Sequence, residues 1–277
     1  MRLLILSILL PISVICQSNY NLSLLGTYDN YNSEGNDIWG WVAPDGSEYA
    51  LVGLNDGFSV VNVTNPSNPV EEFFINDLNS TWRDVKTWGH YAYVTTEAQN
   101  GLLIIDLNPL PTSTNLTTYY YNGPSIDPWA SAHNLYIDDR GYVYIFGANR
   151  GNKGCIILDV NLDPTQPIEV ADIDNWYVHD GMVLGDTLYL ANVSNGFFTV
   201  WDVSDPANPS QLAQQTTPGA FCHNLWTSDD GDRIWTTDEI SNGYIAEYNI
   251  SDLSNITIKD QTQCNPGQDV IPHNTHF

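Results

Sequence analysis

The sequence is poor in positive charge, in cysteine and in long apolar runs. These scarcities limit, in turn, the partners, the disulfides and the membrane spans that the chain can have. Its 277 residues contain eight Lys and Arg against 33 Asp and Glu, a formal net charge of −25. Such a chain repels phosphate backbones, which excludes nucleic acid as a partner and favours cations or basic protein surfaces. Of the four cysteines, Cys155, Cys222 and Cys264 follow the N-terminal segment, so any single disulfide among them leaves one thiol over.

The longest apolar run lies at the N-terminus. Met1 and Arg2 precede an apolar stretch over residues 3–10, which continues to Cys16. The stretch is too short to cross a bilayer and is typical of a secretory signal. We therefore predict a signal peptide over residues 1–16 and a secreted, extracellular or cell-surface protein with no transmembrane segment after its removal. Lipid attachment at Cys16 is an alternative that the sequence leaves open.

A five-fold internal repeat organises the rest of the chain. Each copy follows an apolar β-type run with an Asp or Asn, one apolar residue, a small polar residue and usually a Pro-rich turn. These hinge residues are 44, 53, 43 and 47 residues apart, and they are Asn62, Asp106, Asp159, Asp202 and Asn249. A period in this range with β-type content is typical of propeller blades. We expect each hinge side chain to accept backbone N–H bonds from the turn that follows.

The repeat predicts an all-β fold, a β-propeller of four-stranded antiparallel blades over residues 20–277. In the fourth repeat we expect strands at 181–184, 187–191, 197–202 and 210–214. Two-residue type I′ turns are expected at Asp56-Gly57, Asn100-Gly101, Asn195-Gly196 and Asn242-Gly243. Five full repeats precede the start of a sixth, so we predict a ring of six to seven blades and a chain that is incomplete at its C-terminus. Residues 21–28 resemble an outer strand that completes the last blade.

Several motifs appear in a specific order. They occupy residues 82–94, 132–136 and 178–183, and residues 102–106 read Leu-Leu-Ile-Ile-Asp. Together with the hinges they resemble the LVIVD-repeat proteins, specifically the choice-of-anchor B family, over about residues 20–277. The resemblance implies a secreted or surface-attached propeller. It implies no settled biochemical activity, and the family's anchoring segment is not recognisable here.

The sharpest chemical signal is a histidine at the same position of successive repeats. His133, His179, His223 and His273 each precede a predicted first strand, at spacings of 46, 44 and 50 residues, and each is followed by Asn or Asp. First strands line the central channel of a propeller, so we expect the imidazoles to form a ring around the axis. They are candidate ligands for a transition metal ion such as Zn, Fe or Mn. The alternative is structural, with each imidazole donating a hydrogen bond to the adjacent blade.

Residues near these histidines are candidates for a ligand site at the channel mouth. In the second repeat the histidine position holds Arg83, which would suit an anionic ligand, and in the first repeat it is held by Trp39-Gly40 or nearby residues. The candidate ligand-binding residues are Arg83, Asp84, Asn134, Asp180 and Asn224.

Acidic residues after two second strands are a separate candidate. Glu97 and the Asp238-Glu239 pair occupy matching positions of two repeats. Carboxylates suit Ca²⁺, so these residues are candidate calcium ligands on the rim.

Two functions remain open. The first is a secreted or cell-surface binding module for a protein or glycan ligand. The second is a metal-dependent enzyme (a lyase, hydrolase or oxygenase) with the histidine ring as its metal site. The sequence contains no Gly-rich phosphate loop, no Gly-x-Ser-x-Gly elbow and no Cys-x-x-Cys site that would favour a particular chemistry.

Overall fold

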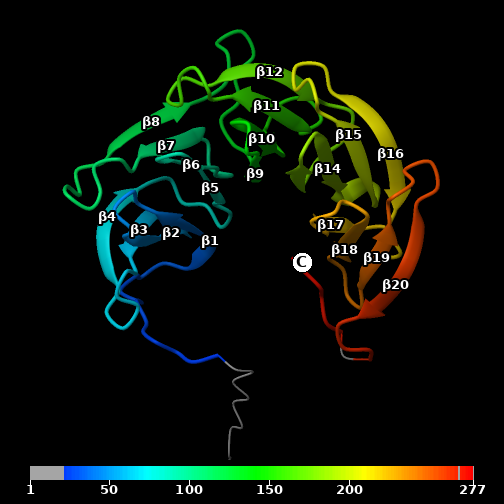
Figure 1. The fold of residues 1–277 in the computed structure, drawn as a ribbon, viewed down its shortest axis with the longest axis horizontal. Helices are drawn as coiled ribbons and strands as arrows, with labels where there is room; N and C mark the ends of the chain where they lie inside the picture. Colours follow the sequence, from blue (N-terminus) through cyan, green and yellow to red (C-terminus); the bar gives the residue numbers. More distant parts are fainter. Residues whose placement is uncertain (1–21, 268, 277) are drawn as a thin grey trace, which may run out of the picture.

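A computed structural model describes residues 22–267 and 269–276, and five four-stranded antiparallel sheets follow one another along this part of the chain (Figure 1). Blade 1 contains β1 (Gly35–Val42), β2 (Glu48–Leu54), β3 (Gly57–Asn62) and β4 (Val70–Asn76). Blade 2 contains β5 (Val85–Trp88), β6 (Tyr91–Val94), β7 (Leu102–Asp106) and β8 (Thr117–Tyr121). Blade 3 contains β9 (Asn134–Ile137), β10 (Tyr142–Phe146), β11 (Cys155–Asp159) and β12 (Ile168–Ile173). Blade 4 contains β13 (Asp180–Leu184), β14 (Thr187–Asn192), β15 (Phe197–Asp202) and β16 (Ser210–Thr216). Blade 5 contains β17 (Cys222–Thr227), β18 (Arg233–Asp238), β19 (Tyr244–Asn249) and β20 (Thr257–Gln263).

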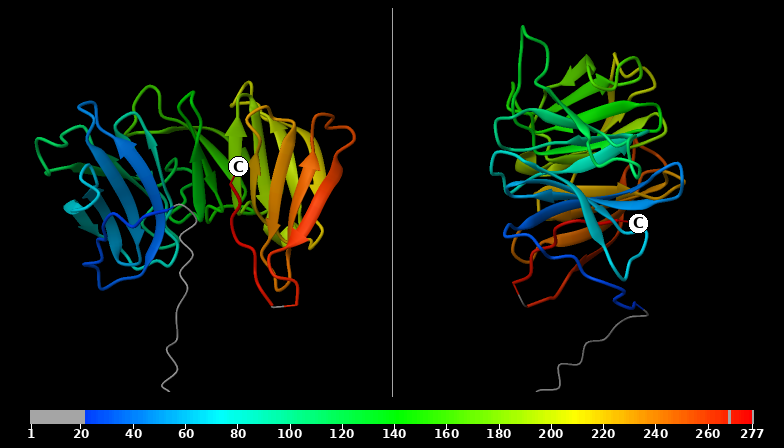
Figure 2. Two further views of the ribbon diagram at one scale, coloured as in Figure 1. Left: turned by 60° about the horizontal axis from the view of Figure 1, so that its bottom comes forward. Right: turned by 90° about the vertical axis from the view of Figure 1, so that its left-hand side faces the viewer.

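The blades fan around a common axis. Strands pair in sequence order within every sheet, and the first strand of each blade lies innermost while the fourth lies outermost (Figure 1). Neighbouring sheets face one another around an arc (Figure 2). The prediction of an all-β propeller of four-stranded antiparallel blades is confirmed. Among the described residues the arc stays open between blade 1 and the C-terminal segment, which runs inward beside β17 (Figure 1).

Apolar side chains fill the space between successive blades. On β7, Leu103 and Ile105 pack in a cluster with blade 1, whereas Leu102 and Ile104 pack in a cluster with blade 3. Side chains of a strand alternate between the two faces of its sheet, so a strand whose sheet packs against blades on both sides is predominantly apolar on both faces. The dense Val, Ile, Leu and Tyr content of the middle strands has this cause.

The five hinge residues all have the predicted role. The side-chain Oδ1 atom of each accepts a hydrogen bond from the backbone N–H two residues further on, at 2.8–3.0 Å. Each hinge thus closes a small turn immediately after the third strand of its blade. The structural interpretation of Asn62, Asp106, Asp159, Asp202 and Asn249 is confirmed.

The predicted type I′ hairpins are wrong. A type I′ turn needs two central residues with positive φ, and none of the four turns has a pair of them. In blade 4, a short 3₁₀ turn (Val193–Asn195) lengthens the connection, and Gly196 alone adopts the left-handed conformation, with φ of 75°. A four-residue connection reverses the chain with one left-handed residue, a glycine, instead of two.

The N-terminal segment differs from its predicted outer strand. Residues 22–34 form no strand. A Cβ atom at Gly26 would lie 2.1 Å from the carbonyl oxygen of Pro66, so this segment packs tightly against the loop between β3 and β4. No sheet edge pairs with it, and an extended segment without a partner ladder is not a strand.

Further predictions from the sequence concern the signal peptide, membrane spans and disulfides. The predicted signal peptide over residues 1–16 lies outside the described residues. In the part of the chain that is described, no helix is long and apolar enough to cross a membrane. Cys155 and Cys222 are buried, Cys264 is exposed, and these three thiols are not joined in disulfides.

Candidate functional site in the axial channel

Acidic and amide side chains from successive blades form one layer at the propeller axis. Five of its members line two separate cavities, of about 280 Å³ and about 300 Å³. We call the whole layer the Asp/Asn layer. The first cavity is called the histidine chamber and the second is called the aromatic chamber. The five shared residues are Asp37, Asp84, Asn134, Asp180 and Asn274.

The four predicted histidines come together in the histidine chamber. They form a column in which successive ring centroids lie 4.0 Å (His133–His179), 4.1 Å (His179–His223) and 4.2 Å (His223–His273) apart. Burial, assisted by the neighbouring imidazoles, lowers the pKa of His179 to about 2 and that of His223 to about 4. Both rings are therefore neutral near pH 7.

Hydrogen bonds between blades determine the tautomer of two of these rings. Nδ1 of His179 lies 3.1 Å from the carbonyl oxygen of His223, and Nδ1 of His223 lies 2.9 Å from the carbonyl oxygen of His273. A carbonyl oxygen only accepts, so Nδ1 carries the proton and Nε2 keeps its lone pair. The structural interpretation, in which imidazoles bridge adjacent blades, is confirmed for this pair.

Two glutamates face the histidine column from equivalent positions. Glu97, after β6, lies with Oε1 2.7 Å from Nδ1 of His133, and this hydrogen bond lowers the pKa of Glu97. Glu239, after β18, lies with its oxygens 3.5 Å from Nε2 of His223 and 3.8 Å from Nε2 of His273. Spacing within the repeat placed both glutamates on matching loops but did not show that they meet the histidines.

The rim calcium site is not formed as predicted. Asp238 is buried and accepts hydrogen bonds from the backbone N–H groups of Gly219 and Phe221 and from the hydroxyl of Thr217. Both carboxylate oxygens of Asp238 thus accept hydrogen bonds from the loop before β17 and are not free to bind calcium. Glu97 and Glu239 face histidines instead of one another.

The predicted metal ligands divide into two pairs. His223 and His273 share a group with Glu239 in which one ligand atom from each lies within 4.8 Å of the others. His133 and His179 do not belong to any such group among the described residues.

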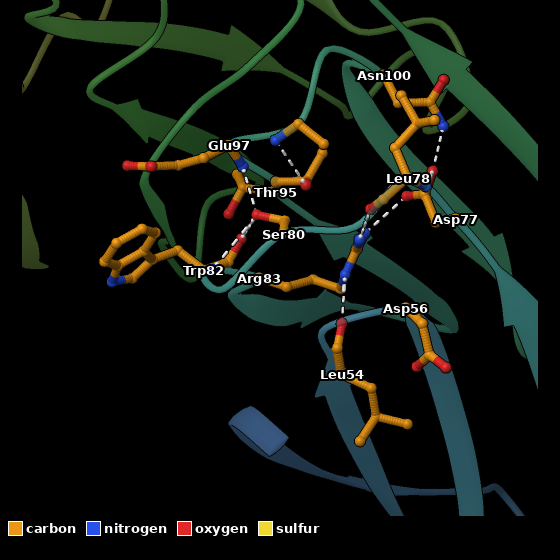
Figure 3. Close-up of polar contacts among 12 residues, drawn as sticks. Leu54, Asp56, Asp77, Leu78, Ser80, Trp82, Arg83, Thr95, Glu97 and Asn100 are labelled. Carbon is orange, nitrogen blue, oxygen red and sulfur yellow. Dashed lines mark hydrogen bonds and ion pairs between the residues drawn. The ribbon is translucent and has the colours of Figure 1, made fainter. Parts of the chain in front are cut away.

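Arg83 does not reach the channel, and this prediction is wrong. Its guanidinium is fully buried and donates to Asp77 Oδ2 at 2.6 Å, to the carbonyl oxygen of Leu54 at 2.9 Å and to that of Leu78 at 2.7 Å (Figure 3). Figure 3 shows Trp82 and Glu97 extending to one side and Arg83 to the other. No strand ladder fixes the direction of a side chain in the linker before a strand. The guanidinium of Arg83 therefore points to its hydrogen-bond acceptors and to its ion-pair partner Asp77, in the region between blades 1 and 2.

The position equivalent to the histidines in blade 1 is Asn36-Asp37, two to three residues before the predicted Trp39-Gly40. Asn36 Oδ1 accepts from the backbone N–H of Arg83 at 3.0 Å, and Asp37 Oδ2 accepts from that of Val85 at 3.0 Å. The same bridge recurs at the other end of the arc, where Asn224 Oδ1 accepts from the backbone N–H of Thr275 at 2.7 Å. Asn36, Asp37 and Asn224 thus each join a blade to the start of the segment that follows it around the axis.

Sequence reasoning missed the aromatic chamber. Tyr136 meets Trp226 edge-to-face with ring centroids 6.4 Å apart, Trp226 lies 4.2 Å from the ring of His276, and Lys86 Nζ lies 4.6 Å from the centre of the Trp39 ring. Each of these residues follows the Asp or Asn of its own blade by two positions. Residues two apart on a strand share a face, so this recurrence was a readable signal.

The predicted polar residues other than Arg83 line the aromatic chamber: they are Asp84, Asn134, Asp180 and Asn224. Burial raises the pKa of Asp84 to about 7, assisted by the nearby charge of Asp37. Burial also raises the pKa of Asp180, whose carboxylate accepts from Asn224 Nδ2 at 2.7 Å. The layer therefore carries less negative charge near neutral pH than its composition suggests.

Fold and site together define a β-propeller-like protein with a two-chambered axial channel. LVIVD repeats are found in it at residues 47–77, 81–120 and 177–217. A search of curated proteins returned no match to the chain.

Solved structures with the same architecture carry diverse names. A putative 6-phosphogluconolactonase from Bacteroides uniformis matches with a TM-score of 0.60 and 14% identity over 80% of this chain and 70% of that one. Hydrazine synthase from Kuenenia stuttgartiensis matches with a TM-score of 0.60 and 11% identity over 88% and 70%. A hypothetical selenium-binding protein from Sulfolobus tokodaii matches with a TM-score of 0.53 and 12% identity over 78% and 59%. At these identities the likeness concerns the fold alone.

Proposed function

We propose that this chain is a secreted or cell-surface binding module of the choice-of-anchor B type, and that it binds a neutral glycan in the aromatic chamber. The observation that carries the proposal is the meeting of Trp39, Tyr136 and Trp226 with the polar side chains of the Asp/Asn layer in one cavity. Ligand sites of this kind combine aromatic walls with a few convergent polar groups.

The chemistry of the chamber matches a sugar. A pyranose ring presents C–H faces that pack on aromatic rings and hydroxyl groups that both donate and accept hydrogen bonds. Asp84, Asp180 and Asn134 offer carboxyl and amide groups to such hydroxyls. The volume of about 300 Å³ is at the lower end for ligand pockets, which suits one or two terminal sugar units.

Charge favours a neutral sugar over an anionic one. The net charge of −25 repels sialylated or sulfated glycans. With a pKa of about 7, Asp84 is protonated in roughly half of the molecules near neutral pH and donates as well as accepts. The alternative of a metal-dependent lyase, hydrolase or oxygenase would use the other chamber, where His223, Glu239 and His273 could hold an ion.

A glycan array probed with the purified protein tests this function. We expect neutral glycans among the hits, and calorimetry on the best hit to show that Trp39→Ala weakens binding by about thirtyfold, the effect of losing an aromatic contact worth about 2 kcal/mol. Trp82→Ala is the matched control, because Trp82 is exposed and lines the other chamber. An array without hits, or equal weakening by the two variants, would overturn the proposal. Capture of a basic protein through Trp39 would replace the glycan by a protein ligand.

A further inference from the structure

We propose that the histidine chamber binds one divalent transition-metal ion between His223, Glu239 and His273. These residues come from β17, from the loop after β18 and from the C-terminal segment, and they are 16 to 50 residues apart in sequence. The tertiary structure alone brings one ligand atom from each to within 4.8 Å of the others. The site goes beyond the glycan function and does not depend on it, because the Asp/Asn layer lies between the two chambers.

The distances suit a small ion. Zinc binds imidazole nitrogen at about 2.0–2.1 Å and carboxylate oxygen at about 2.0–2.2 Å, which places tetrahedral ligand atoms about 3.3 Å apart. Glu239 oxygens lie 3.5 Å from His223 Nε2 and 3.8 Å from His273 Nε2. Small side-chain adjustments close this difference, since the side chains of Glu239 and His273 are 35% and 63% exposed.

The hydrogen bond of His223 prepares its ring for a metal. Nδ1 donates to the carbonyl oxygen of His273, so Nε2, the atom facing Glu239, presents a lone pair. Metal-binding histidines commonly use their second nitrogen in this way, which fixes both the tautomer and the ring orientation. The described residues supply three ligands in this group, which leaves a fourth position for water.

The surroundings favour a cation. Asp37 and Glu239 line the chamber, and no Lys or Arg is among its lining residues. Arg83, the cation expected at this position, is paired with Asp77 on the other side of the linker. A set of two imidazoles and one carboxylate suits Zn²⁺ or another first-row transition metal, whereas Ca²⁺ takes oxygen ligands.

The test uses the untagged, chelator-treated chain titrated with Zn²⁺ by calorimetry and with Co²⁺ by visible absorption. We expect one ion per chain and a Co²⁺ spectrum of a four-coordinate site. Glu239→Gln and His273→Ala, both at partly or largely exposed side chains, should weaken Zn²⁺ binding by at least about tenfold, because each variant alters one ligand. Matched controls are His276→Ala, in the aromatic chamber, and His90→Ala, on a distant hairpin.

A further variant separates metal binding from folding. In His223→Asn the amide nitrogen replaces Nδ1 and keeps the bond to the carbonyl oxygen of His273, while Nε2 is lost. We expect this variant to melt near the wild-type temperature and to lose the Co²⁺ spectrum. Absence of Zn²⁺ binding in the wild-type chain, or unchanged binding in Glu239→Gln and His273→Ala, would overturn the proposal. Glycan binding that persists in the metal-free protein would leave the proposed function standing in either case.

Discussion

Nδ1 of His223 lies 2.9 Å from the carbonyl oxygen of His273, 50 residues further along the chain. His179 has the same relationship to His223, at 3.1 Å and a separation of 44 residues. The repeat period thus becomes a chain of hydrogen bonds that runs from blade to blade near the axis. One imidazole serves two purposes, because its Nδ1 joins two blades while its Nε2 remains available in the chamber.

Removing this bond should destabilise the protein. His179→Ala leaves the carbonyl oxygen of the buried residue His223 without its partner, so we expect the free energy of unfolding to fall by about 1–3 kcal/mol in urea titrations. His179→Asn supplies an amide donor in the place of Nδ1 and should recover most of this loss. His90→Ala, at a partly exposed hairpin tip, should change stability by less than about 0.5 kcal/mol. If His179→Asn were as unstable as His179→Ala, the hydrogen bond would not be the cause.

The buried ion pair between Arg83 and Asp77 should matter more. Arg83→Leu leaves the Asp77 carboxylate buried without its cation, and breaking a buried pair in this way costs about 3–5 kcal/mol. Arg233→Leu is the matched control, because Arg233 is 54% exposed in its pair with Glu247 and such pairs contribute at most about 1 kcal/mol. Chemical unfolding of both variants gives the comparison. Similar losses in the two would show that Arg83 does not join blades 1 and 2.

Asp84 should make stability depend on pH. Its pKa is about 7 in the folded protein and about 3.9 in the unfolded chain, so between these values the folded state holds a proton that the unfolded state has lost. The contribution of Asp84 to stability therefore falls as pH rises from about 4 to 7 and is constant above that range. The charged and titratable groups around it are Asp37, Lys86, His133 and Asp180.

Asp84→Asn removes this titration. We expect its melting temperature to equal that of the wild type near pH 4 and to exceed it by a growing margin up to about pH 7, in scanning fluorimetry across a pH series. Asp139→Asn, at an exposed turn, controls for the general effect of removing one negative charge. A margin for Asp84→Asn that stays constant from pH 4 to pH 8 would contradict the raised pKa.

The repeat could be predicted from the sequence because its defining hydrogen bonds join residues that are close together in the chain. Asp202 and its four counterparts close their turns with bonds to residues two positions away, so a pattern of a few letters contains the whole interaction. The histidine column was also readable in part, since an equal position in successive blades implies an equal radius from the axis. The direction of Arg83 was not, because its partners Leu54 and Asp77 belong to blade 1 and to the end of its outer strand.

By itself the sequence determined the blade, its period, the turn closed by each hinge residue and the histidine positions nearest the axis, because these depend on alternation and spacing within one repeat. Only the tertiary structure decided that an Asp/Asn layer divides the channel, that Glu239 meets His223 and His273, and that aromatic rings gather at the opposite end. These relationships depend on the tilt and distance between neighbouring sheets, which the packing of apolar side chains between the blades sets and which no single repeat contains.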